Sequence, residues 1–274
     1  MRSVAFVNRK GGVGKSSCVL HLGVRFAQMG LKTLLIDVDP QASLSQGLLG
    51  RDALGIDPSD TLASLFDETG VPLAGLVREG GRDNLFLVPG HERMALFNVP
   101  APWDAGPIQF GLRDMLAEVA GDYDLCLLDC PPHIQLCAWS ALLVADGVIV
   151  PAQLEDFGVQ GVAAILDTID QARVMGNPDL RLLGILPTMF DRRLSIHQSY
   201  RVDALEVFGP DLFAEVVPAS TDFKTAVTLH KGVTEHKPRG EASKALGRVA
   251  DEVLSRLADR CAGQGIKSPS KGVA

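Results

Sequence analysis

The stretch NRKGGVGKSS, which starts at Asn8, combines the residue types that bind nucleotide phosphates. Its G-K-S ending matches the phosphate-loop pattern G-x-x-x-x-G-K-[ST], whereas Arg9 stands at the position of the first glycine. In such a loop, backbone N–H groups converge on an anion, Lys15 adds a full charge at the β- and γ-phosphates, and the Ser16 hydroxyl ligates magnesium. The stretch therefore predicts a phosphate loop, with a second lysine, Lys10, at its entrance.

Two further hydrophobic runs end in carboxylates. LCLLDCPP ends its apolar part at Asp129, and TLLIDVDPQ carries Asp37 and Asp39. If both runs are parallel strands, their carboxyl ends meet near the phosphate loop, where a carboxylate can hold the hydration shell of Mg²⁺. Taken alone, an aspartate at the end of a strand is more often a helix cap or a turn residue. Together with the phosphate loop, these aspartates favour a hydrolytic site.

Strands and helices must bring these residues together. Runs rich in apolar and β-branched residues predict strands at residues 4–8, 33–37, 85–89, 125–129, 147–151, 182–186 and 212–217. Helical spacing of apolar residues predicts helices at 16–29, 110–120, 159–175, 196–208 and 241–257, and Gly30 follows the first as a C-terminal glycine would. Residues 51–83, rich in Gly, Pro and charge, predict a surface excursion with short helices.

This alternation predicts an α/β fold of three layers, in which a mostly parallel, twisted sheet carries helices on both faces. Ligands of such folds bind beyond the carboxyl ends of the strands. We expect one domain over residues 1–261. The remaining residues 262–274, AGQGIKSPSKGVA, are small and polar and predict a disordered tail.

The composition limits the class of protein. The 274 residues are 46% hydrophobic with only 5% aromatic, which suits buried parallel strands. The formal net charge of −7 argues against a protein covered in basic charge, although a local basic face could still bind nucleic acid. No apolar run approaches the roughly 20 residues that span a bilayer. Five cysteines without a signal segment ahead of them predict a cytoplasmic setting, and Cys126 and Cys130 lie at strand spacing, which argues against a metal pair.

Four motifs, in this order and spacing, resemble the deviant Walker A ATPases of the ParA/Soj partitioning type, within the wider group that includes MinD. These motifs are KGGVGKSS, LLIDVDPQAS, LCLLDCPP and GILPTMFDRR, and the resemblance covers residues 1–258. It implies a P-loop NTPase fold, ATP and Mg²⁺ as cofactors, and an ATP hydrolase that is slow alone and stimulated by a partner. In this family the first loop glycine is dispensable, so Arg9 does not disable the loop.

The resemblance also assigns roles to residues. Lys10 matches the signature lysine that reaches across an ATP-bound homodimer, and Asp39 matches the carboxylate that positions the attacking water. The catalytic residues would then be Lys10, Lys15 and Asp39. Magnesium would be held by Ser16 and, through water, by Asp129, while Ser17 would contact the α-phosphate. The nucleotide-binding set would comprise Lys10, Gly11, Gly12, Val13, Gly14, Lys15, Ser16 and Ser17, with Thr188 and Pro218 near the base.

Family members of this kind bind non-specific double-stranded DNA as ATP dimers through basic side chains. Arg193 matches a position where the family carries such an arginine, Arg192 lies beside it, and Lys224 could extend the surface. Interspersed acidic residues leave a solvated charged face as the alternative, and ASTDFKTAVTLHKG, after Pro218, lacks the arginine-rich start of closer relatives. The resemblance further implies a ParB-like adaptor, a plasmid, chromosome or other cargo, and a nucleoid-associated cytoplasmic location without a membrane partner.

Other functions remain open. A MinD-like membrane-cycling ATPase needs a C-terminal amphipathic helix, whereas the tail has only Ile266 and Val273 as large aliphatic residues. A metabolic P-loop enzyme, such as a ligase or an iron–sulfur reductase, needs a second substrate pocket or cysteines placed for a cluster. A scaffold that binds nucleotide without turnover needs none of the hydrolytic carboxylates that this chain carries.

Overall fold

The computed structural model describes residues 1–67, 71–154 and 159–258, and the tail expected from residue 262 lies outside them. A seven-stranded sheet has the order β3-β4-β2-β5-β1-β6-β7. The strands are β1 (Arg2–Phe6), β2 (Thr33–Asp37), β3 (Arg78–Glu79), β4 (Leu85–Val88), β5 (Leu125–Asp129), β6 (Gly147–Gln153) and β7 (Arg181–Thr188). Neighbouring strands are parallel except β3, which is antiparallel to β4.

The helices connect these strands. They are α1 (Lys15–Gln28), α2 (Ser43–Leu49), α3 (Ala63–Phe66), α4 (Leu73–Leu76), α5 (Gly111–Glu118), α6 (Leu136–Val144), α7 (Val159–Met175), α8 (Ser195–Phe208), α9 (Thr221–Thr228), α10 (Val233–His236) and α11 (Glu241–Ala258). None of those in the described part of the chain is both long and apolar enough to cross a bilayer.

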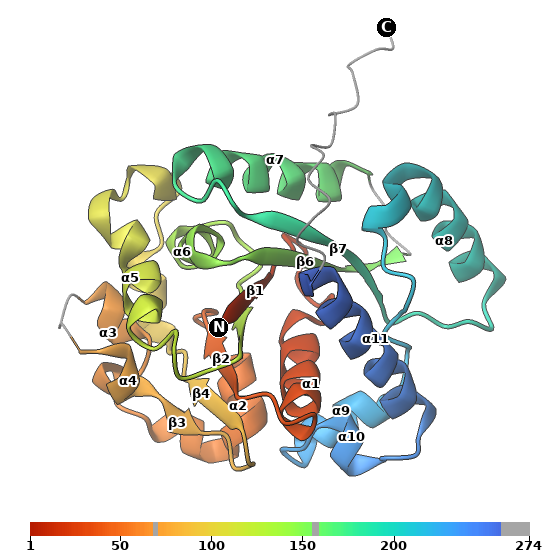
Figure 1. Cartoon of the computed structure of the whole chain (residues 1–274), viewed down its shortest axis with the longest axis horizontal. Helices are drawn as coiled ribbons and strands as arrows, with labels where there is room; N and C mark the ends of the chain where they lie inside the picture. Colours follow the sequence, from red (N-terminus) through yellow and green to blue (C-terminus); the bar gives the residue numbers. More distant parts are fainter. Residues whose placement is uncertain (68–70, 155–158, 259–274) are drawn as a thin grey trace, which may run out of the picture.

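Alternate strand residues face two separate hydrophobic cores, so the fold has the predicted three layers. Ala5 of β1 belongs to one core, together with α5, α6 and α7, whereas Phe6 belongs to the other, with α1 and α11. Figure 1 shows α6 and α7 on one side of β6 and β7, and α1, α9 and α11 on the other. The α/β expectation is confirmed.

The structure corrects one predicted strand, and its described residues contain four helices that were not predicted: α2, α6, α9 and α10. Residues 212–217 form no strand of the sheet, because only an isolated bridge joins Leu212 to Ile185 before the chain continues toward α9. The sequence did not reveal α6, which is buried around most of its circumference and therefore lacks the polar face that marks an amphipathic helix. The excursion with short helices is present, since α3, α4 and short 3₁₀ turns lie there.

A buried histidine holds α1 against the C-terminal helices. His21 of α1 is 1% exposed, its Nδ1 accepts a hydrogen bond from the Val233 N–H at 3.1 Å, and its ring centroid lies 5.1 Å from that of Phe223. Burial lowers the pKa of His21 from 6.5 to about 4. The folded protein therefore holds this ring neutral at pH values where the unfolded chain protonates it.

This difference predicts a pH-dependent stability. Between about pH 6.5 and pH 4, the His21 ring is protonated in the unfolded chain but not in the folded one. The free energy of unfolding therefore has its largest value above pH 6.5 and decreases as the pH falls toward 4. His21 alone should account for a loss of about 3 kcal/mol. Urea unfolding of His21→Asn, which keeps an acceptor for Val233, should lack this component, whereas the exposed-site control His133→Asn should retain it. Equal pH slopes for all three proteins would contradict the assignment.

Candidate nucleotide-binding site

The register of the sheet brings the motif residues to one edge. Asp129, at the end of β5, lies opposite Phe6 of β1 on one side and opposite Asp37 of β2 on the other. The loop from Val7 to Gly14 follows β1, and α1 begins directly after it at Lys15. The predicted phosphate loop and the predicted carboxylates therefore meet at the carboxyl edge of adjacent strands, where α/β folds bind ligands.

The loop has the backbone of an anion cradle. Gly12 and Gly14 have φ values of 77° and 89°, in the left-handed region that favours glycine. A Cβ built at Gly11 or Gly12 would meet no atom within 4 Å, so the loop borders open space. No acidic residue in the first turn of α1 and no side-chain cap competes for its N–H groups. The helix start is therefore available to an anion.

Neighbouring strands hold this loop in place. Asn8 donates from Nδ2 to the Pro151 carbonyl at 2.6 Å, and its Oδ1 accepts from the Lys10 N–H at 2.9 Å. Thr188, at the end of β7, donates from its hydroxyl to the Val13 carbonyl at 2.8 Å. The Thr188 side chain thus links the end of β7 to the loop. Its expected contact with the base stays a prediction, as does that of Pro218, which lies beside Phe190 just beyond β7.

The two lysines of the loop lie in different surroundings. Lys15 is 7% exposed, and its Nζ lies 3.5 Å from the Lys10 carbonyl, so the side chain folds back over the loop. Lys10 is exposed at the loop entrance, where a second subunit could reach it. Ser16 and Ser17 are partly buried in the first turn of α1.

Asp129 is a buried carboxylate without a hydrogen-bond partner among the described residues. It is fully buried, and neither of its oxygens accepts a hydrogen bond from a described residue. Burial, and next the charge of Asp37, raise its pKa well above the usual range, while the Ser16 hydroxyl lowers it without reaching hydrogen-bond geometry. A cation beside this carboxylate would stabilise its ionised form. The donor set of Asp129 and Ser16 therefore fits Mg²⁺, which takes one or two protein oxygens and keeps several waters.

A second carboxylate is held by a network that the motifs did not reveal. Asp37 accepts hydrogen bonds from the Ser45 N–H at 2.8 Å and the Ser45 hydroxyl at 2.7 Å, and Ser45 Oγ accepts from the Gly90 N–H at 3.0 Å. Burial raises the pKa of Asp37 to about 7. Its other oxygen accepts from the Asp39 N–H at 3.3 Å, and Asp39 Oδ1 accepts from the Gln41 N–H at 2.9 Å. The network ties the backbone of Asp39 to β2, α2 and the end of β4.

Ser45→Ala should therefore destabilise the protein. It removes the hydroxyl that satisfies both Asp37 and the buried Gly90 N–H, and each buried group left without a partner costs about 1–3 kcal/mol. We expect the free energy of unfolding in urea to fall by about 2 kcal/mol. Ser43→Ala, at an exposed position of the same helix, is the matched control and should change it little. The same loss in both variants would argue against the network.

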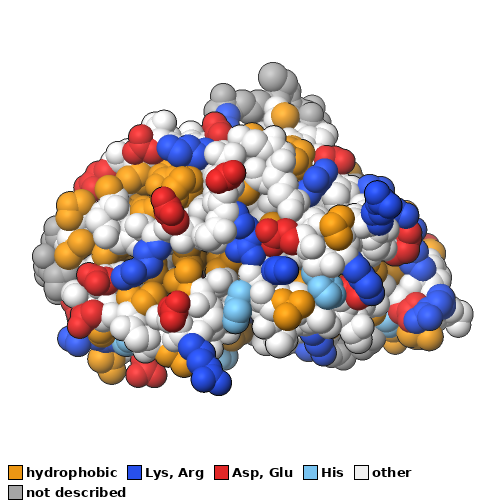
Figure 2. Space-filling model, turned by 90° about the horizontal axis from the view of Figure 1, so that it is seen from below, with side chains coloured by type: hydrophobic (Ala, Val, Ile, Leu, Met, Phe, Trp, Pro, Cys, Tyr) orange, Lys and Arg blue, Asp and Glu red, His pale blue; other side chains and the backbone are white. Residues whose placement is uncertain are grey.

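The predicted DNA-contact residues lie on the segment after β7 and on α9. Arg193 pairs with Asp191 at 2.8 Å and Arg192 approaches Glu215 at 3.9 Å, while Lys224 is exposed on α9. The hydrogen bonds from Arg193 lower the pKa of Asp191 to about 2. Figure 2 shows basic and acidic side chains interspersed on the face it presents. Both arginines are solvent-exposed and paired, so DNA binding and a solvated charged face both stay open.

Known proteins resemble the chain over nearly its whole length. A family model described as an AAA domain matches residues 1–182. The chain is 35% identical to the chromosome-partitioning ATPase Soj of Thermus thermophilus over 94% of this chain and 97% of that protein. It is 31% identical to the chromosome partitioning protein ParA of Caulobacter vibrioides over 95% of this chain and 96% of that protein.

A solved structure resembles the fold as well. Cobyrinic acid a,c-diamide synthase from Mycobacterium smegmatis, with bound ADP and magnesium, superimposes with a TM-score of 0.77 at 27% identity, covering 94% of this chain and 96% of that one. The chain matches Soj and ParA in sequence over nearly its whole length, and its phosphate loop and carboxylates meet at one edge of the sheet. These observations identify its family. It belongs to the ParA/Soj family of deviant Walker A ATPases.

Proposed function

We propose that this protein is an ATP-dependent switch that hydrolyses ATP with Mg²⁺ and uses the cycle to position a plasmid, a chromosome region or another cargo. One observation carries the hydrolytic part: the buried Asp129, which has no hydrogen-bond partner among the described residues, lies beside the phosphate loop, and the adjacent strand β2 ends at Asp37, two residues before Asp39. The family relationship to Soj and ParA supports both the ATPase activity and the partitioning role.

Each residue of the site has a separate role in the proposed transfer of the γ-phosphoryl group to water. Water attacks the γ-phosphorus, the bond to the bridging oxygen of ADP breaks, and phosphate leaves. Asp39 holds the attacking water, and Lys15 with the loop N–H groups stabilises the charge that develops on the phosphate oxygens. Ser16 and, through water, Asp129 would hold magnesium, which would supply positive charge at the β- and γ-phosphates. Lys10 adds a second cation only when two subunits enclose the nucleotides, so ATP controls dimerisation.

The ATP-bound homodimer is proposed to bind non-specific double-stranded DNA through Arg192, Arg193 and Lys224. Such contacts reach phosphates and carry no base readout. A ParB-like adaptor would stimulate the slow hydrolysis and return the protein to its free state. The protein would then work in the cytoplasm on the nucleoid.

A metabolic role on the same fold is the second candidate. The similarity to a diamide synthase supports it, but the identity to that enzyme is 27%, below the 31–35% shared with ParA and Soj.

DNA binding to a long random-sequence duplex, with ATP, ADP or no nucleotide, separates these functions when mass is followed by light scattering. We expect binding and a dimer mass with ATP only. Replacing Arg192 and Arg193 by Ala should leave the dimer intact and reduce the slope of log K against log salt by about 2, one for each phosphate contact. Replacing the exposed Arg51 and Arg113 by Ala removes the same charge elsewhere and is the control. An ATP dimer that ignores DNA would favour the metabolic role.

A further inference from the structure

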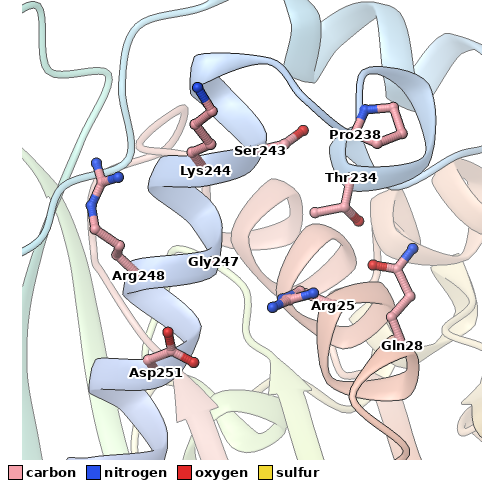
Figure 3. A pocket seen from close by; sticks show the side chains of 9 residues that line it. All are labelled: Arg25, Gln28, Thr234, Pro238, Ser243, Lys244, Gly247, Arg248 and Asp251. Atoms are coloured by element: carbon pink, nitrogen blue, oxygen red, sulfur yellow. The ribbon is translucent and has the colours of Figure 1, made fainter.

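A hollow far from the phosphate loop lies between the last turns of α1 and the start of α11. Its volume is about 460 Å³, within the range of small-molecule sites. It is lined by Arg25, Gln28, Thr234, Pro238, Ser243, Lys244, Gly247, Arg248 and Asp251. In Figure 3 the Arg25 guanidinium points from α1 toward α11, and Thr234 is seen above it in the same lining. The hollow thus joins the far end of α1, whose first turn belongs to the nucleotide site, to α10 and α11, which that site does not use.

Two polar atoms of this hollow are buried and have no hydrogen-bond partner in the part of the chain that the structure describes. Arg25 Nε and Thr234 Oγ1 are both excluded from solvent, and neither makes a hydrogen bond to a described residue. Buried polar groups are nearly always satisfied, so each such atom needs a ligand or a water. Arginine only donates, and a threonine hydroxyl can donate. Their ligand must therefore accept hydrogen bonds.

The charges of the lining residues favour an anion at Arg25. Lys244 is paired with Glu241 at 2.7 Å and Arg248 with Glu215 at 2.9 Å. Among the described residues, Arg25 forms no ion pair. Asp251 lies on the α11 wall and disfavours an anion there, so the ligand must sit on the α1 side, between Arg25 and Thr234.

A glycine leaves the α11 wall open. Gly247 lies inside an 18-residue helix, where glycine is less favourable than alanine. A Cβ at this position would meet no atom within 4 Å, so packing does not require the glycine. Its effect is to leave room in the hollow.

We propose that this hollow is an oxyanion site that takes a phosphate group, with Arg25 and Thr234 as its donors. A phosphate accepts from both groups at once and pairs with the guanidinium. Because Arg25 lies ten residues after Lys15 on α1, about 15 Å along the helix, a bound phosphate would tie the far end of the helix that carries the phosphate loop to α11. The proposal does not depend on ATP hydrolysis.

The site can be tested by ¹⁵N NMR of arginine side chains, with inorganic phosphate as the probe. The protein is first saturated with ADP and Mg²⁺, so that the phosphate loop does not take up the probe. We expect the Nε–H signal of Arg25, assigned by its absence in Arg25→Lys, to move saturably with phosphate but not with chloride at equal ionic strength. The signal of the exposed Arg113 is the internal control and should stay in place.

Gly247→Leu fills the hollow while leaving Arg25 in place, and it should weaken the phosphate titration at least fivefold. No saturable shift of Arg25, an equal shift with chloride, or an unchanged titration in Gly247→Leu would overturn the proposal. A second titration, with a short DNA duplex and with ATP and Mg²⁺ in place of ADP, identifies the source. If DNA moves the same signal and Arg25→Lys weakens DNA binding, the phosphate belongs to a polynucleotide, and a response to free phosphate alone indicates a small phosphorylated molecule.

Discussion

Lys15→Ala should abolish nucleotide binding while leaving the fold intact. The Lys15 side chain is almost fully buried, and its Nζ lies over the loop near the Lys10 carbonyl, with no carboxylate paired to it among the described residues. A buried ammonium group in this position can pair with the phosphates of ATP when the nucleotide binds. Removing one partner of a buried ion pair costs about 3–5 kcal/mol, which is a loss in ATP affinity of more than about 100-fold.

The measurement is a titration with ATP and Mg²⁺ followed by calorimetry, beside thermal unfolding of the apo protein. Lys231→Ala removes a lysine at an exposed position and serves as the control, with unchanged affinity expected. Micromolar affinity retained in Lys15→Ala would contradict the assignment of the phosphate loop. A collapse of apo stability instead would show that Lys15 is needed for folding.

The sequence predicted well those elements whose patterns are local. The strands at 33–37 and 125–129 and the helix at 159–175 have the predicted bounds, because β-branched runs and helical spacing are visible in short windows. Helix α6 was not predicted, because nearly all of its residues are apolar and the sequence therefore shows no alternation of polar and apolar faces. The run at 212–217 has strand composition, yet backbone bonds from Phe213 to Ile185 and from Val217 to Pro187 hold it only loosely beside β7. Composition could not distinguish this edge contact from a full strand.

The candidate site divides in the same way. The loop and the three aspartates were predicted because each belongs to a short motif on a single strand end. Ser45 and Asn8 were missed, because their roles depend on partners brought near by the fold: Ser45 bonds across to Gly90, and Asn8 to Pro151. Likewise, the lack of hydrogen-bond partners for the Asp129 carboxylate among the described residues depends on how the chain packs around it. A motif names the residue, and only its surroundings reveal that its oxygens lack partners.

Asp39→Ala should separate binding from hydrolysis. Asp39 lies on the loop after β2, where its N–H bonds to the Asp37 carboxylate and its own carboxylate accepts only from the Gln41 N–H among the described residues. Removing the carboxylate therefore takes away the group proposed to position water but leaves the phosphate loop and Asp129 in place. General base and positioning groups of this kind contribute about 10²–10⁴-fold to rate, so turnover should fall by that factor with ATP affinity nearly unchanged.

The variant is best measured by phosphate release together with dimer mass and DNA binding in ATP. We expect a long-lived ATP dimer that stays on DNA, because the step that ends the ATP state is blocked. Asp60→Ala, an exposed aspartate beyond α2, is the matched control and should turn over normally. Loss of dimerisation in Asp39→Ala would instead assign the carboxylate a structural role through its bond from the Gln41 N–H. The two outcomes correspond to two roles of the Asp39 carboxylate. In the first it positions the attacking water, and in the second it stabilises the turn after β2.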